Sequence, residues 1–316
     1  MFDWLEEQQE VFTPVQMPDS EYREIPAISG TDVRTFVVEG PKTYNYFKTG
    51  LLETEETTAL ILGTAIHCAI LEPEKFAQEY TVYAGAKPNS EQKKQFATLI
   101  SEGTDRFKAY STTYSVAKKS EDKINELANE LYTELFGYIL HLEKSKGKIA
   151  LDEETYKTVL NCRDEVQDRI NNLFSGPNFK IYTEIPLFGT YKNQKLKGKL
   201  DMLVVDSENK EVFIVDVKTT NSYKSGLRSD MLKKRYDLQL DFYEYLVNQQ
   251  HCFKDFFIRK IIITVQTLGA NTSAVIKLIT DNNIETILDD IAYRNDTNFW
   301  RDYSTLTWEG FNIYDN

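Results

Sequence analysis

Two short stretches decide the fold and point to its chemistry: Lys199-Leu200-Asp201 and Ile214-Val215-Asp216-Val217-Lys218. Each lies in a run rich in β-branched and other apolar residues, and a turn-like polar segment separates the runs. The pattern predicts two neighbouring antiparallel strands that bring Asp201 and Asp216 close together. Asp216 and Lys218 are two positions apart, so their side chains share one face of a strand. The sequence therefore predicts two carboxylates and an ammonium at one strand end.

Two carboxylates suit Mg²⁺, a hard cation that prefers oxygen ligands and keeps several waters. The backbone carbonyl of Val217 would add another oxygen. Lys218 would orient or deprotonate the attacking water and offset charge on a scissile phosphate. The predicted chemistry is metal-assisted hydrolysis of a phosphodiester. An Asp-x-Lys triplet at a strand end is also typical of a surface ion pair, and the triplet alone does not separate the two interpretations.

Four further residues are candidates for the same site. Glu184, on the strand before Asp201, offers a third carboxylate; its structural alternative is an exposed edge glutamate. Gln239 and Tyr243 lie four apart on a predicted helix, hence on one face, although Gln239 also fits an ordinary helix surface. His67 ends a small-residue segment that permits close packing, and its alternative is a structural hydrogen-bonding histidine.

The remaining pattern predicts an α/β fold. Residues 1–27 are acidic and proline-containing, and we expect them to form an arm over the surface. Residues 28–316 are expected to form a single domain, mainly helical over 28–175 and built on a sheet over 176–316. Helices are predicted after an N-cap at Ser29 or Thr31 and at about 56–71, 152–174, 236–249 and 283–299; strands are predicted at 80–83, 182–188, 196–205, 212–217, 258–266 and 274–279.

The charge distribution is uneven. The net charge of −12 argues against indiscriminate nucleic-acid binding. Lys and Arg nevertheless outnumber Asp and Glu between residues 190 and 235, which would form either a local phosphate-binding surface or a merely solvated one. Tyr223 and Tyr236 would either stack on exposed bases or serve as core or interface residues, as most tyrosines do. The candidate phosphate contacts are Lys192, Lys195, Lys197 and Lys199, then Lys224, Arg228, Lys233, Lys234 and Arg235 in a segment interpreted as a loop.

Composition excludes several classes of protein. The three cysteines and three histidines are scattered, so we expect neither a disulfide framework nor a zinc or iron–sulfur site. No run approaches the roughly 20 apolar residues of a membrane helix. The N-terminus has no basic segment followed by an apolar one, so it does not resemble a secretory signal. The expectation is a cytoplasmic protein without a membrane partner.

The motifs resemble those of a known family. Asp201 and Asp216-Val217-Lys218, followed by the Gln239 and Tyr243 spacing, resemble the PD-(D/E)xK nuclease superfamily in its RecB-like branch. The stretch GTAIHCAILEPEKF at 63–76 is similar to the histidine block of RecE-type exonucleases (exonuclease VIII). The resemblance extends from about residue 28 to Trp300.

This resemblance implies a restriction-endonuclease-like mixed β-sheet core flanked by helices, with a helical N-terminal elaboration. Leu200 stands where many members of the superfamily have proline. The roles implied by position are metal ligation by His67, Asp201, Asp216 and the Val217 carbonyl, catalysis by Lys218, and support of the active site by Glu184, Gln239 and Tyr243.

The implied activity is that of an exonuclease that needs Mg²⁺, with Mn²⁺ as a substitute, and digests linear double-stranded DNA from its ends. By the same resemblance it would work 5′ to 3′ and leave 3′ single strands for a single-strand annealing protein. The expected assembly is a ring-shaped homo-oligomer in a bacterial or phage-infected cell. Two alternatives stay open: a structure-specific endonuclease or repair nuclease, and a non-catalytic DNA-binding recombination scaffold.

Overall fold

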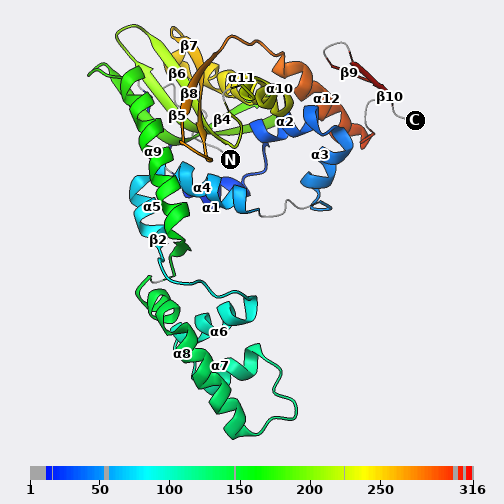
Figure 1. Ribbon diagram of the computed structural model, residues 1–316. Coiled ribbons are helices and arrows are strands. Elements are labelled where there is room, and N and C mark those ends of the chain that lie inside the picture. Colours follow the sequence, from blue (N-terminus) through cyan, green and yellow to red (C-terminus); the bar gives the residue numbers. More distant parts are fainter. Residues whose placement is uncertain are drawn as a thin grey trace. The chain divides into compact units, whose positions relative to one another are not determined.

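The structure, a computed structural model, describes residues 12–15, 17–52, 57–145, 147–223, 225–301, 305–308 and 311–314 (Figure 1). The chain forms two compact units, one made of Met1–Gly63 with Cys162–Asn316 and the other of Thr64–Asn161. Residues 1–11 and 16 of the expected N-terminal arm lie outside the described part. The expected single domain over 28–316 stays a prediction.

The larger unit is built on a six-stranded mixed sheet. β6 and β7 run parallel, as do β1 and β5, whereas the pairs β4–β5, β5–β6 and β7–β8 are antiparallel. This mixed sheet flanked by helices confirms the predicted fold class. The strand order is β1 (Ile28–Ser29), β5 (Gln194–Asp206), β6 (Glu211–Thr220), β7 (Phe257–Gln266) and β8 (Ser273–Leu278), with β4 (Phe179–Tyr191) paired to β5.

The remaining elements are mostly helical. Those of the larger unit are α1 (Asp19–Glu24), α2 (Gly30–Val38), α3 (Pro41–Lys48), α10 (Leu227–Lys234), α11 (Tyr236–Asn248), the 3₁₀ turn His251–Phe253, α12 (Ile284–Thr297) and the strands β9 (Thr305–Trp308) and β10 (Phe311–Tyr314). The smaller unit contains α5 (Pro73–Glu79), β2 (Tyr80–Val82), α6 (Glu91–Ser101), α7 (Arg106–Thr113), α8 (Glu121–Ser145) and β3 (Ile149–Leu151). The division falls within α4 (Thr58–Leu71) and α9 (Glu153–Leu173). Among the described helices, none combines the length and the apolar character that crossing a membrane requires.

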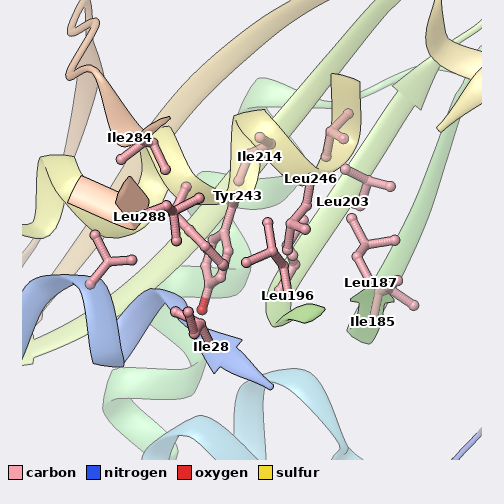
Figure 2. Packing of buried hydrophobic residues seen from close by; sticks show 14 of the residues in the cluster. Ile28, Ile185, Leu187, Leu196, Leu203, Ile214, Tyr243, Leu246, Ile284 and Leu288 are labelled. Atoms are coloured by element: carbon pink, nitrogen blue, oxygen red, sulfur yellow. The ribbon is translucent and has the colours of Figure 1, made fainter. Parts of the chain in front are cut away.

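Helices cover both faces of the sheet in the larger unit. Phe36 of α2, Phe242 of α11 and Leu288 of α12 join Ile214 of β6 in one buried cluster, part of which Figure 2 shows. The preceding residue on β6, Phe213, points to the opposite face, where its ring packs edge-on against Phe174 just after α9. A sheet covered on both faces explains why its strands are apolar runs rather than strictly alternating ones.

The start of α2 is fixed by its sequence. Ser29 caps the helix by accepting a hydrogen bond from the Asp32 amide, and the Asp32 carboxylate accepts one from the Ser29 amide, as a capping box. The predicted N-cap at Ser29 is therefore confirmed. A Cβ at Gly30 would lie 3.3 Å from both Gln239 and Tyr243, so this glycine lets α2 approach α11 closely.

Two expectations need correction. The strands β4 and β5 extend beyond their apolar cores, because their hydrogen-bonded ladder continues through polar pairs such as Thr190 with Lys195. The segment interpreted as a basic loop contains the helix α10. That helix buries only Leu227 and its N-cap Gly226 makes no side-chain capping bond. Apolar periodicity therefore gave no signal for it.

Candidate active site

Three acidic residues occupy one row across three neighbouring strands. Thr183 and Ile185 pair with Met202 and Leu200, a register that puts Glu184 opposite Asp201. Met202 pairs with Val215, so the next position along brings Asp201 opposite Asp216. The predicted antiparallel pairing that joins the two aspartates is confirmed.

Asp201 forms the side-chain link between β5 and β6. Its Oδ2 accepts a hydrogen bond from the Val217 amide at 2.7 Å. In an extended strand the amide and carbonyl of one residue point to the same edge. The Val217 carbonyl therefore also faces the Asp201 side of β6, as its predicted role requires.

Asp216 and Lys218 form a closely held ion pair. The Lys218 Nζ lies 2.7 Å from each carboxylate oxygen of Asp216, a side chain with 1% of its surface exposed. Burial lowers the pKa of Lys218, but the charges of Asp216 and Asp201 outweigh it and leave this pKa above its ordinary value. Lys218 is therefore an ammonium at neutral pH, and its burial excludes the surface ion pair that the triplet alone left open.

Tyr243 and Gln239 stand beside this pair on α11. Gln239 Nε2 donates a 2.7 Å hydrogen bond to Tyr243 Oη. Burial, followed by the charges of Asp216 and Asp201, holds the pKa of Tyr243 well above its ordinary value, so the phenol stays neutral. Figure 2 shows the Tyr243 ring reaching from α11 toward Ile28 of β1. Gln239 thus bonds a site residue rather than covering an ordinary helix surface.

Glu184 lies in the acidic row, but its carboxylate is engaged elsewhere. It forms an ion pair with Lys199, which is also 3.1 Å from Asp19. Its backbone is left-handed, with φ of 53°, an uncommon conformation for a residue in a strand. The role predicted for Glu184 stays a prediction, and Lys199 is its observed partner.

His67 lies on the part of α4 that belongs to the smaller unit and is partly exposed. The aspartates belong to the larger unit. The predicted approach of His67 to them stays a prediction.

The candidate phosphate contacts have different surroundings. Lys197 is buried and donates to the carbonyls of Tyr22, Arg23 and Ile25 at the end of α1. All three ammonium protons are then used inside the protein, which argues against contact with a phosphate. Lys192 pairs with Asp289 at 2.5 Å.

The other basic candidates lie closer to the surface. Arg235 pairs with Asp237 at 2.9 Å, and Lys224 lies outside the described residues. The exposed members of the predicted set are Lys192, Lys195, Arg228, Lys233 and Lys234.

Tyr236 has a different environment from the one expected for base stacking. Only 9% of its surface is exposed, and it packs with Leu240 and Ile262. Cations surround its ring: Lys218 Nζ lies 5.2 Å from the ring centroid and Arg34 Cζ 5.9 Å. Sequence reasoning missed Arg34, because its partner is about 200 positions away along the chain. Tyr223, by contrast, is 72% exposed.

The donors present suit a hard divalent cation. Asp201, Asp216 and the Val217 carbonyl offer only oxygen, the ligand type that Mg²⁺ and Mn²⁺ prefer. No group of three or more His, Cys, Asp and Glu side chains is arranged to hold a metal within the described ranges. Two carboxylates and one carbonyl are few protein ligands, which suits a cation that keeps several waters, as Mg²⁺ does.

The mixed sheet flanked by helices and the Asp-x-Lys spacing of Asp216 and Lys218 at the end of a central strand are the features of a PD-(D/E)xK-type domain. Residues 37–297 match the family described as a PDDEXK-like domain of unknown function (DUF3799), and the chain belongs to that family. Domains of this class are nuclease domains that typically use divalent metal ions.

Comparisons beyond the family are more distant. No curated protein matches the sequence. A crystal structure of a putative exonuclease from Eubacterium rectale is similar at 14% identity, covering 90% of this chain and 85% of that chain, with a TM-score of 0.45. The structure of a protein designated SSO0001 is similar at 13% identity, covering 84% and 86%, with a TM-score of 0.27.

Proposed function

We propose that this protein is a metal-dependent deoxyribonuclease that hydrolyses phosphodiester bonds of linear double-stranded DNA from its ends. The observation that carries the proposal is the pairing of Asp201 opposite Asp216, with the Lys218 ammonium 2.7 Å from Asp216. Two carboxylates and a cation are what metal-assisted phosphodiester hydrolysis needs. Membership of the PDDEXK-like family supports the same reaction class.

Each residue has a distinct task in this proposal. Asp201, Asp216 and the Val217 carbonyl hold Mg²⁺, for which Mn²⁺ substitutes. The ion, when bound, acts as a Lewis acid on the scissile phosphate and its attacking water. Lys218, as an ammonium, would donate hydrogen bonds to the water or to a phosphate oxygen and offset negative charge. Gln239 and Tyr243, hydrogen-bonded to each other on α11, support the active site beside the two aspartates.

The finer assignments rest on the RecE-type resemblance. They are 5′-to-3′ digestion, 3′ single strands passed to an annealing protein for recombination, ring-shaped homo-oligomerisation, and action in the cytoplasm of a bacterial or phage-infected cell. His67 as a metal ligand and Glu184 as a third carboxylate belong to the same set.

The test uses linear duplexes labelled at the 5′ or the 3′ end, together with a covalently closed circle of the same sequence. Each substrate is incubated with Mg²⁺ or with EDTA, using the native protein and Lys218→Ala. Release of the 5′ label before the 3′ label, only with Mg²⁺ and only by the native protein, supports the proposal. Early 3′ release would reverse the polarity, and cutting of the circle would show an endonuclease. A lack of cleavage of any substrate would refute nuclease activity and leave a DNA-binding scaffold.

A further inference from the structure

The ring of Tyr236 brings together cations from three separate elements. Arg34 of α2 and Lys234 of α10 each lie 5.9 Å from the ring centroid, and Lys218 of β6 lies 5.2 Å from it. The ring itself is fixed, because Tyr236 is buried against Leu240 and Ile262. The three positive charges are therefore held around one ring, and one of them, Lys218, also pairs with Asp216 of the candidate active site.

These cations differ in the anions that face them. Lys218 pairs with Asp216. The pKa of Asp230 is lowered mainly by the hydrogen bonds that it accepts from Ser222 and Thr220. The nearby charge of Lys234 lowers this pKa further, by a smaller amount. Arg34 is half-buried, and among the described residues it has a ring contact with Tyr236 but neither an ion pair nor a hydrogen bond.

Other arginines of the larger unit are used differently. Arg235 pairs with Asp237, Arg259 with Glu211 and Arg294 with Asp290, at 2.8 to 2.9 Å. Each of these guanidiniums is therefore paired with a carboxylate of the protein itself. Within the part of the chain that the structure describes, Arg34 has no such partner, so its donors are available to a ligand.

The charge balance indicates what that ligand is. A divalent ion held by Asp201 and Asp216 would match their two negative charges, which leaves Lys218 and Arg34 to be matched by an anion. A guanidinium lying over an aromatic ring keeps its in-plane N–H groups free to donate, and these fit two oxygens of a phosphate.

We propose that Arg34, held over Tyr236, binds a backbone phosphate of the DNA. This phosphate is adjacent to the scissile phosphate. The inference rests on the proposed function and assigns to α2 a substrate-positioning residue outside the Asp-x-Lys motif. Tyr236 is then the support for this arginine and not a base-stacking surface.

The experiment measures DNA binding without turnover. A fluorescein-labelled duplex oligonucleotide is titrated in EDTA with the native protein, Arg34→Ala, Arg34→Lys and Arg259→Ala, at several salt concentrations. Arg259→Ala is the matched control, because it removes the same charge from a residue already paired with Glu211. Circular dichroism confirms that each variant is folded.

Arg34→Ala should raise the Kd about tenfold, the loss expected for a charge-assisted contact. It should also reduce the slope of log K against log salt by about 0.9, since one phosphate contact is lost. Arg34→Lys should keep the salt slope and weaken binding less, and Arg259→Ala should match the native protein. Equal Kd and slope for Arg34→Ala and Arg259→Ala would overturn the proposal, as would a native protein that does not bind the duplex.

The binding assay and the cleavage assay fail independently. If the native protein cleaves DNA while Arg34→Ala binds normally, the Arg34 proposal is wrong and the nuclease proposal stands. If the native protein binds DNA through Arg34 but never cleaves it, the phosphate contact stands without nuclease activity.

Discussion

The carboxylate of Asp201 accepts a 2.7 Å hydrogen bond from the amide of Val217, one position beyond Asp216 on the neighbouring strand. Main-chain pairing between β5 and β6 ends next to this bond, at Met202 and Val215, while β6 continues to Thr220 paired with β7. A site residue thus replaces a main-chain acceptor. The same contact that holds β6 in place also fixes the carboxylate beside Asp216.

Two substitutions at Asp201 separate its structural hydrogen bond to the Val217 amide from its charge at the candidate active site. Asp201→Asn keeps an oxygen that can accept from the Val217 amide but removes the charge, so we expect nearly native stability with loss of metal-dependent cleavage. Asp201→Ala leaves the Val217 amide without that acceptor and should lower the free energy of unfolding by about 1–3 kcal/mol. Urea unfolding of both variants provides the comparison. Equal destabilisation by Asn and Ala would show that the hydrogen bond has no structural role.

Packing around Tyr243 leaves no room at Gly198. A Cβ there would lie 2.7 Å from Leu246 Cδ1 and 3.0 Å from Tyr243 Cδ1. Gly198→Ala should therefore destabilise the protein by about 1–3 kcal/mol and displace Tyr243 from the site. Gly137→Ala is the control, because its Cβ would meet only Tyr83 Oη at an ordinary 3.5 Å. Thermal unfolding measures both, and a native-like Gly198→Ala would contradict the packing argument.

A buried ion pair holds α11 to the sheet away from the active site. Lys260 donates to Asp241 and Glu244 at 2.5 Å and to the Thr280 carbonyl at 2.6 Å, with 5% of its side chain exposed. Lys260→Met would leave the buried Asp241 carboxylate without its cation. It should lower the free energy of unfolding, measured in urea, by about 3–5 kcal/mol. The exposed Lys277, on the neighbouring strand β8, is the control, and Lys277→Met should change stability by less than about 0.5 kcal/mol. Similar values for the two variants would refute the role of the pair.

Low pH should remove the stabilisation of the folded state that the ionised Asp206 carboxylate provides. Hydrogen bonds from the side chain and amide of Asn209, joined by the Glu208 amide, outweigh burial and lower the pKa of Asp206 in the folded state. A lowered folded pKa gives stability that is present above the ordinary value of 3.8 and is lost as pH falls through the folded value. The stability difference between native protein and Asp206→Ala should therefore shrink from pH 7 to pH 3. Unfolding at both pH values tests this, and a constant difference would be inconsistent with it.

Local patterns predicted most of the strands and helices of the larger unit. Apolar runs and helical spacing located the strands around Asp201 and Asp216 and the helix carrying Tyr243, because these elements bury continuous apolar faces. The helix α10 was missed because it buries only Leu227.

The site was predictable only where its contacts are local or follow from strand pairing. Asp216 and Lys218 are two residues apart, and a hairpin joins them to Asp201. Lys197 could not be placed from sequence, because the carbonyls that it binds belong to a segment more than 170 residues earlier. Arg34 could not be predicted as a site residue for the same reason, because Tyr236 is far away along the chain. Its significance depends on the ring of Tyr236.

The most direct test of the central claim measures acid-soluble nucleotide released from a uniformly labelled linear duplex as Mg²⁺ is titrated. The proteins compared are native, Asp216→Asn, Lys218→Ala and the surface control Asp164→Asn. We predict saturable, Mg²⁺-dependent release by the native protein and the control, and release lower by about 100-fold or more in the two site variants. Native-like release by Asp216→Asn or Lys218→Ala, or undiminished release in EDTA, would contradict the assignment of these residues to a metal-dependent nuclease site.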